Sequence, residues 1–499
     1  MTAYTCDAVK TKRAYGLDAL RGLAILLMVL SGRIPWGSFP RWMYHGYYVP
    51  PDMTYTVIPG ITWVDLVFPF FIFAMGAAFP LALTKRLAGG MGKPQIVKGI
   101  LKRGVLLLAF AIYNQHFMVW PMAGGNPEWY HYAVALLGFI FMFAIWGRFP
   151  WKISPKVYFA IKIAAILIVL VIFWNMSYRG ESFSLYRNNI ILHVLANMAV
   201  VGALIWLFTH SRLSVRLGLM AVFLAINLSY REEGSWMHIV GTTHTLPFIA
   251  DFIKDRVSDN MLPYVRWLYD FSWIGRWNYY KYLFIIIPAT ICGEHLVTWI
   301  NEKEYTEKVV EWSKARLLTI AGFMFGFNLL VITLLYMRFV FWSTLISLVA
   351  GYIVYRLTKD HKTSIEKLIF KLYCWGFLWY IIGVFVDPFE GGVKKDPSTL
   401  SYYFITAGLA YFLIIAFGIL IDIFKVKKGT TLLVENGQNP MIAYVGYSNL
   451  ILPIIGLVGI VEYINQLPPG WGLIYGIAST LVIAFIVKGF TKLKIFLRT

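Results

Sequence analysis

The sequence predicts an all-α, polytopic membrane protein, a bundle of about 11–14 transmembrane helices with both termini on the cytoplasmic side. Three observations support this prediction. Hydrophobic residues make up 59% of the 499 residues and charged residues only 14%, whereas soluble domains carry about 25% charged residues. The apolar residues form continuous runs of roughly 20 residues, the length that crosses about 30 Å of hydrocarbon. The basic residues are concentrated in every second connection between the runs, as in other multi-pass proteins.

The apolar runs are predicted to be helices, because backbone N–H and C=O groups inside lipid must be paired within the protein. A membrane β-barrel would show alternating polar and apolar residues instead. Some runs are short or amphipathic, so the expected number of spans extends below the number of runs. The runs are 15–33, 62–84, 100–120, 130–147, 158–175, 190–208, 215–230, 279–299, 316–335, 339–357, 368–386, 401–422, 440–460 and 471–489.

The first run predicts the orientation of the chain. Lys10, Lys12 and Arg13 precede it, as in a signal peptide, but the run contains two charged residues and no small-residue cleavage site follows. We therefore expect a retained first helix with a cytoplasmic N-terminus. If all the runs cross, most Lys and Arg residues then face the cytoplasm, which also places the C-terminus there.

The whole chain, residues 1–499, is interpreted as one integral-membrane domain with an external segment at 231–278, either a lid or a pair of interfacial helices. The net charge of +20 would suggest nucleic acid in a soluble protein, but here the basic residues act as topology signals. The lipid bilayer is therefore the expected partner, not nucleic acid. Cys6, Cys292 and Cys374 lie far apart, so we expect neither a disulfide framework nor a metal site.

His45 is the first candidate for chemistry. It lies in the aromatic loop "RWMYHGYYVPPD" between the first two runs, where Pro50 and Pro51 restrict the backbone. With the predicted topology the loop is external. An imidazole titrates near neutral pH and can act as a general base or a nucleophile. The alternative is an interfacial histidine without a catalytic role.

Asp65 is the second candidate, because a carboxylate within a membrane span costs free energy unless another group offsets it. It lies near the external end of the second run and can orient the His45 ring, as the aspartate does in nucleophilic triads. The alternative is a carboxylate at a helix N-terminus, stabilised by the helix dipole.

The cytoplasmic side offers two groups of charged residues. Asp18 and Arg21 lie three residues apart on one helix face; they either pair with each other or present Arg21 to an anionic ligand. Lys102 and Arg103, at the start of the third run, either extend such an anion site or anchor the topology. The remaining candidates carry less weight. They are His116, His131, His238, His244 and the amide cluster of "ENGQNPMIAY", in which Asn436 or Asn439 can cap a helix that begins at Pro440.

Several motifs resemble one family. "YGLDALRGLAILLMVL", a loop histidine and "GITWVDLVFPFFIFAMG" follow one another within the first 85 residues. This order and spacing resemble the heparan-alpha-glucosaminide N-acetyltransferase-like membrane proteins, including their uncharacterised bacterial relatives. "GGVKKDPSTLSYYFITAG" and "GQNPMIAYV" are similar to two later segments of the family, through Lys395, Thr399, Ser401, Gly437 and Asn439.

The resemblance implies a bacterial cytoplasmic-membrane acyltransferase that takes an acetyl group from cytoplasmic acetyl-CoA. The acetyl group would pass to an amine or hydroxyl of a sugar on the external face. His45 would then be the catalytic residue, with Asp65 holding its ring. Lys395, Thr399, Ser401 and Asn439 would donate hydrogen bonds to the carbonyl oxygen or the sugar, while Asp18, Arg21, Lys102 and Arg103 would serve the CoA side. No metal is implied, and a homo-oligomer is allowed.

Two other classes of function use the same features. A transporter or flippase for a lipid-linked sugar or other glycan precursor would also need many helices, charges within spans and aromatic external loops. A membrane scaffold without catalytic activity needs no buried aspartate near a stiff histidine loop, so it explains the pattern least well.

Overall fold

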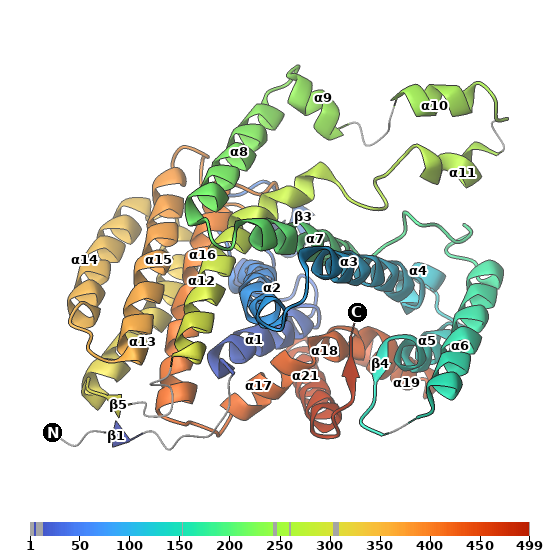
Figure 1. Cartoon of the computed structure of the whole chain (residues 1–499). Helices are drawn as coiled ribbons and strands as arrows, with labels where there is room; N and C mark the ends of the chain where they lie inside the picture. The colour runs from blue at the N-terminus through green and yellow to red at the C-terminus, as the bar shows by residue number, and fades with distance from the viewer. Residues whose placement is uncertain are drawn as a thin grey trace. The chain divides into compact units, whose positions relative to one another are not determined.

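The computed structural model describes residues 4–5, 13–151, 153–242, 247–258, 261–302 and 309–498 (Figure 1). Helices dominate, and each of the apolar runs coincides with helical structure, which confirms the all-α prediction. Within these residues, 12 helical stretches are long and apolar enough to cross a membrane, a number inside the predicted range. The first and third runs are helices outside this set: α1 (Tyr15–Ser31) has 17 residues and α3 (Lys93–His116) has several basic residues.

The chain divides into two compact units. The first unit contains Met1–Gly90, Phe284–Tyr447 and Glu462–Leu493, and the second contains Met91–Leu283, Ser448–Val461 and Lys494–Thr499. Each is described by itself. The interpretation of the whole chain as one membrane domain stays a prediction.

The first unit consists of long helices joined by short elements. Among these, strands β1 and β5 form one antiparallel pair, and β2 and β3 form another. Its elements, with η7 reaching across the unit boundary, are β1 (Tyr4–Thr5), α1, η1 (Arg41–Met43), β2 (Tyr48–Val49), β3 (Thr54–Tyr55), α2 (Trp63–Ala88), α12 (Leu283–Asn301), β5 (Val309–Val310), α13 (Lys314–Leu330), η5 (Val331–Leu335), α14 (Val340–Thr358), α15 (Ser364–Val386), α16 (Leu400–Phe417), η6 (Gly418–Ile423), α17 (Thr430–Gln438), α18 (Pro440–Gly446), η7 (Tyr447–Ile451), α20 (Val461–Asn465) and α21 (Pro469–Lys492).

Two buried helices, α2 and α16, form the centre of the first unit. Every residue of α16 is buried, as are most residues of α2. Helix α16 packs against α15, α13, α1 and α2 (Figure 1). Their nearly continuous apolar sequences suit helices surrounded by protein on all sides. Pro69 and Pro80 lie inside α2, which membrane helices tolerate because neighbouring groups satisfy the freed carbonyls.

Helices α1 and α17 cross in very close contact, and two glycines make the contact possible. A Cβ on Gly22 would overlap the Leu433 carbonyl, and one on Gly437 would overlap the Asp18 carbonyl. Small residues let membrane helices approach backbone to backbone in this way. Gly437, one of the residues on which the family resemblance rests, therefore has a packing role.

The second unit is also helical, and its strands β4 and β6 form one antiparallel pair. Within it α3 packs against α7, and α5 packs against α6 and α19. Its elements are α3, α4 (Val119–Ala123), α5 (Trp129–Trp146), β4 (Gly147–Arg148), α6 (Pro155–Asn175), α7 (Ile190–Thr209), α8 (Leu213–Arg231), α9 (Trp236–Thr242), α10 (Pro247–Lys254), α11 (Leu262–Val265), η2 (Arg266–Leu268), η3 (Trp277–Tyr282), α19 (Leu452–Leu457) and β6 (Phe496–Leu497).

The segment 231–278 holds the short helices α9, α10 and α11. Its length and helical content are compatible with both a lid and interfacial helices, so the choice between them stays a prediction. His238 lies in α9, and its ring donates to the Tyr230 carbonyl. His244 lies outside the described residues.

Candidate active site

The loop that carries His45 is held by side-chain bonds to its own backbone. The buried Tyr44 hydroxyl accepts from the N–H groups of Ser38 and Phe39, both at 3.0 Å, and donates to the Pro35 carbonyl. Arg41 Nε donates to the Gly46 carbonyl at 2.7 Å. The strands β2 and β3 close the far side of the loop. These bonds fix the backbone on both sides of His45, in agreement with the stiff loop that the sequence predicts.

Asp65 lies in the first turn of α2, and only 1% of its side chain is exposed. Its Oδ2 accepts from the N–H groups of Gly46 and Thr62, each at 3.0 Å. The Thr62 N–H bond is one half of a capping box, in which a residue in the first turn bonds back to the helix cap. Thr62 Oγ1 donates to the Tyr44 carbonyl at 2.6 Å. The carboxylate thus joins the start of α2 to the histidine loop.

The predicted contact between His45 and Asp65 is confirmed. His45 Nδ1 lies 2.7 Å from Asp65 Oδ1, and 29% of the histidine side chain remains exposed. Since Asp65 Oδ2 is occupied by backbone donors, Oδ1 is the oxygen that receives a proton from the ring. The hydrogen bond assigns the neutral tautomer with its proton on Nδ1, which leaves a lone pair on Nε2.

Lys395 is the third member of the cluster. It lies in the connection between α15 and α16, and its Nζ is 2.9 Å from His45 Nδ1, 3.3 Å from His45 Nε2 and 3.8 Å from Asp65 Oδ1. Only 19% of its side chain is exposed. Three segments that are far apart in sequence therefore bring one imidazole, one carboxylate and one amine together. The sequence predicted all three residues, but it did not predict that Lys395 contacts the histidine itself.

The charges around His45 favour its neutral form. Burial lowers the pKa of His45 below its ordinary value of 6.5, Lys395 lowers it further, and Asp65 raises it. Burial also lowers the pKa of the Lys395 amine, an effect that Asp65 opposes. A neutral imidazole with a free Nε2 is the form that acts as a base or a nucleophile near pH 7.

Two residues of the site were not among the sequence candidates. A Cβ on Gly46 would lie 2.6 Å from the Gly60 carbonyl oxygen and 3.1 Å from Asp65 Oδ2, so only glycine fits without displacement. Thr62 holds the backbone at both Tyr44 and Asp65. The spacing of Thr62 and Asp65, three residues apart before an apolar run, is a helix-start signal that would have pointed to Thr62.

Most of the chain matches one family model. The domain of unknown function DUF5009 matches residues 13–296, a stretch that contains His45 and Asp65. This chain belongs to the DUF5009 family. Lys395 lies beyond the matched stretch of this DUF5009 chain.

The DUF5009 chain is also similar to two named proteins. Heparan-alpha-glucosaminide N-acetyltransferase of Mus musculus is 28% identical over 141 residues, which are 28% of this chain and 20% of the mouse protein. The Homo sapiens protein of the same name is 29% identical over 113 residues, 22% of this chain and 15% of the human protein. The matches thus cover about a fifth or less of these relatives' own length. They support a distant relationship to the family that the motifs resemble.

Thr399 and Ser401 of the DUF5009 chain lie at the start of α16, close to Lys395 in sequence. Thr399 Oγ1 accepts from the Lys394 N–H at 3.0 Å and from Ser401 Oγ at 2.8 Å. Thr399 also caps α16 by accepting from the Tyr402 N–H. These bonds shape the turn that presents Lys395. A direct contact of the two hydroxyls with a substrate stays a prediction.

Asp18, Arg21 and Asn439 lie in another part of the first unit. Arg21 bonds to the Gly437 carbonyl at 3.2 Å, to the Ala74 carbonyl at 3.1 Å and to Asp18 at 3.4 Å. Asp18 and Arg21 thus pair, and Arg21 also joins α1 to α2 and α17. The buried Asn439 links α17 to α18. From Arg21 to the end of α1 there are ten helical residues, roughly 15 Å, so this group is separate from the His45 cluster.

Lys102 and Arg103 lie on α3 in the second unit, and both are exposed. Their proposed part in binding CoA stays a prediction, as does that of Asp18 and Arg21.

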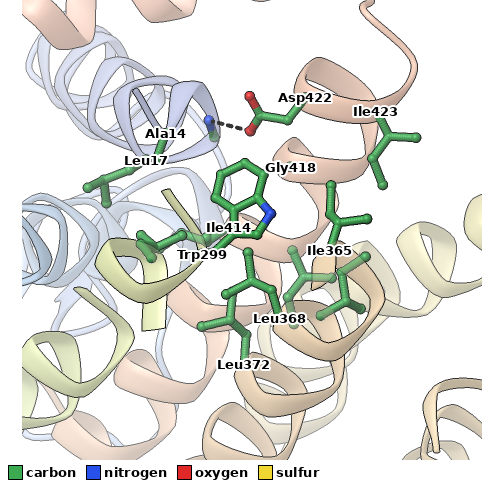
Figure 2. A pocket seen from close by; sticks show the side chains of 14 residues that line it. Ala14, Leu17, Trp299, Ile365, Leu368, Leu372, Ile414, Gly418, Asp422 and Ile423 are labelled. Atoms are coloured by element: carbon green, nitrogen blue, oxygen red, sulfur yellow. Dashed lines mark hydrogen bonds between the residues drawn. The ribbon is translucent and has the colours of Figure 1, made fainter. Parts of the chain in front are cut away.

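An apolar pocket lies in the first unit (Figure 2). It is lined by α1, α12, α15, α16 and η6, at the ends of these helices remote from the histidine loop. Trp299 and Leu368 are among its lining side chains, and Asp422 is its charged member. The Asp422 carboxylate accepts from the Gly16 N–H at 3.4 Å, at the start of α1. Among the described residues that line it, none belongs to the His45 cluster.

Proposed function

We propose that this DUF5009 protein is a membrane-bound acyltransferase in which His45 is the reacting residue. The observation that carries the proposal is the 2.7 Å contact between His45 Nδ1 and a buried carboxylate, which leaves Nε2 available on a partly exposed ring. A carboxylate that orients a histidine in this way is the common arrangement of acyl-transfer sites on unrelated folds. The distant likeness to an N-acetyltransferase supports the same class of reaction.

The finer proposal is transfer of an acetyl group from cytoplasmic acetyl-CoA to an amine or hydroxyl of a sugar on the external face. The C–S bond of the thioester breaks, an N–C or O–C bond to the acceptor forms, and the acceptor's proton ends on the sulfur of CoA. His45 Nε2 either removes the acceptor's proton or carries the acetyl group between the two substrates. Asp65 stabilises the positive charge that the ring gains in either route.

The remaining candidates have supporting roles in this proposal. Lys395, Thr399 and Ser401 donate hydrogen bonds to the reacting carbonyl oxygen or to the sugar. Asn439 is not included in this step, because it lies between α17 and α18, apart from the His45 cluster. Arg21, paired with Asp18 in the first unit, and separately Lys102 and Arg103 in the second unit are proposed to serve the CoA side, because basic residues attract an anionic substrate.

A transfer assay with purified protein tests the proposal. The full chain in proteoliposomes is given acetyl-CoA labelled in the acetyl group, with glucosamine as the probe acceptor. We expect label on glucosamine with the wild type and none above background with His45→Ala. His238→Ala serves as the matched control, because it removes a histidine of the second unit and should retain transfer.

The assay also separates the proposed function from its rivals. Full transfer by His45→Ala, at equal expression and thermal stability, would show that His45 is not the reacting residue. Movement of unmodified glucosamine into the vesicles, with no labelled product, would favour a transporter. A thermal shift with acetyl-CoA adds an independent readout, since a ligand that binds only the folded state stabilises it.

A further inference from the structure

The Lys395 amine lies against the His45 ring, where its positive charge disfavours a second positive charge on the ring. Its Nζ is 3.3 Å from Nε2 and 2.9 Å from Nδ1. A lysine ammonium has three donors and no acceptor, so its shorter contact, with the Nδ1 that gives its proton to Asp65, is a contact of the charge with the ring and not a hydrogen bond. The amine thus lies beside both ring nitrogens, and Nε2 keeps its lone pair for the reaction. A protonated imidazole would place two cations in contact.

The backbone of the loop that carries Lys395 is fixed by bonds to neighbouring segments. The fully buried Asp387 accepts from Arg338 Nη1 at 2.9 Å and from the Val393 N–H. The Val393 carbonyl in turn accepts from the Gly60 N–H at 2.8 Å, just before α2. The loop is thus tied to the segment that presents Asp65, so the amine is positioned by the same framework as the carboxylate.

We infer that Lys395 is a positioning residue for His45, whose ammonium group keeps the imidazole neutral while Asp65 holds its proton on Nδ1. The inference rests on the proposed function for its purpose, because a neutral ring is useful only if His45 reacts. Asp65 acts in the opposite sense, since its negative charge favours the imidazolium. The charged and titratable groups that face the ring come from its own loop, from α2 and from the loop before α16. They are Tyr47, Asp65, Lys395 and Asp396.

The arrangement also affects the step in which Nε2 takes a proton. The ring then becomes positive beside Lys395, and the repulsion favours early release of that proton to the leaving sulfur. Lys395 Nζ already forms an ion pair with Asp65 Oδ1 at 3.8 Å, so a small movement of the amine shortens this pair while the ring is charged. Lys395 therefore makes His45 a weaker base but a stronger acid.

The test measures the protonation of His45 without any substrate. Diethyl pyrocarbonate acylates an imidazole only while the ring is neutral, and mass spectrometry of the digest reads the rate at His45 separately from other histidines and other side chains. The full chain in detergent is treated over a range of pH, as wild type, Lys395→Met, Lys395→Gln, Lys395→Arg and Asp65→Asn. Lys394→Met is the matched control, because the neighbouring Lys394 donates to the Glu390 carbonyl at 3.1 Å. The rate at His131 in the same digest checks that each variant is folded.

Loss of the positive charge should raise the pH at which His45 reacts half-maximally. At pH 6 we expect roughly three- to tenfold slower modification in Lys395→Met and Lys395→Gln, since a neighbouring like charge disfavours the charged form of a group. Lys395→Arg and Lys394→Met should match the wild type, and Asp65→Asn should shift the midpoint to lower pH. The inference would be overturned if the pH of half-maximal modification at His45 were unchanged in Lys395→Gln. It would also be overturned if that pH shifted in Lys395→Met but not in Lys395→Gln. Because no acetyl-CoA is used, failure of the proposed transfer reaction would leave these results unaffected.

Discussion

The change Asp65→Asn separates the structural role of this residue from its role on His45. The carboxylate accepts from the N–H groups of Gly46 and Thr62 on Oδ2 and from His45 Nδ1 on Oδ1. Asparagine has one oxygen and one NH₂ group. If the oxygen replaces Oδ2, both backbone bonds survive and the NH₂ group faces Nδ1. Two donors cannot pair, so the ring must carry its proton on Nε2 instead.

The structure allows both effects to be estimated. Hydrogen bonds to a charged acceptor are stronger than neutral ones by about 1 kcal/mol, so the two backbone bonds together lose roughly 2 kcal/mol of unfolding free energy. A proton on Nε2 removes the base altogether, and general base catalysis contributes about 10²- to 10⁴-fold to turnover. We therefore expect a folded, moderately destabilised protein whose transfer rate falls by two to four orders of magnitude.

The labelled-acetyl assay measures the transfer rate. Stability is measured by size-exclusion chromatography, as the loss of the folded protein's peak after heating. Glu390→Gln is the matched control, because Glu390 accepts from the N–H groups of Leu400 and Ser401 at the start of α16. It should lose stability and retain turnover. Turnover of Asp65→Asn within threefold of the wild type would refute the assignment of the ring tautomer.

Three further predictions follow from the packing and the charges. Gly437→Ala should destabilise the protein by about 1–3 kcal/mol, because the added Cβ overlaps a carbonyl oxygen of α1. Gly218→Ala is the control and should leave the stability unchanged, because a Cβ there meets open space; thermal unfolding measures the melting temperature of both variants. Arg338→Met leaves the buried Asp387 without its 2.9 Å ion-pair partner, so a loss of about 3–5 kcal/mol is expected, with reduced turnover in the same preparation. Since the pKa of His45 is lowered by burial and by Lys395, kcat/KM should fall on acidification only below pH 6.5; an acid limb centred above that pH would contradict the neutral-ring model.

The long helices could be predicted because the bilayer leaves the backbone few choices. The apolar runs have lengths set by hydrocarbon thickness, and all of them coincide with helices. The π-helical segments η5, η6 and η7 were not predicted. They depend on how one helix packs against its neighbours, and the spacing of apolar residues within a run does not report that.

The site could be predicted as a set of residues, but only partly as a geometry. The contact of His45 with Asp65 follows from one stiff loop between two adjacent helices, which limits how far the residues can separate. Lys395 is 350 residues from His45 along the chain, and only the packing of α2 against α16 brings them together. For Asn439 and Arg21, the motif match identified the residues but did not predict where they lie. In the structure both lie where α1 crosses α17, away from His45.

The two interpretations of Asp65 that the sequence left open are both correct in structural terms, and the comparison with Glu390 explains why. Each carboxylate satisfies backbone N–H groups at the start of a buried helix, α2 or α16, and the two starts are linked by the Tyr402 hydroxyl, which donates to the Asp65 carbonyl at 2.8 Å. Glu390 directs both oxygens to the backbone of α16, whereas Asp65 directs one oxygen to the backbone and one to the imidazole. The sequence signals differ, because Asp65 lies three residues after Thr62 in the first turn of α2, whereas Glu390 precedes Leu400 by ten residues, so the sequence marks only Asp65 as a carboxylate at a helix start. What distinguishes the residue expected to affect chemistry is the partner of its second oxygen, and that partner is set by the loop on which His45 lies.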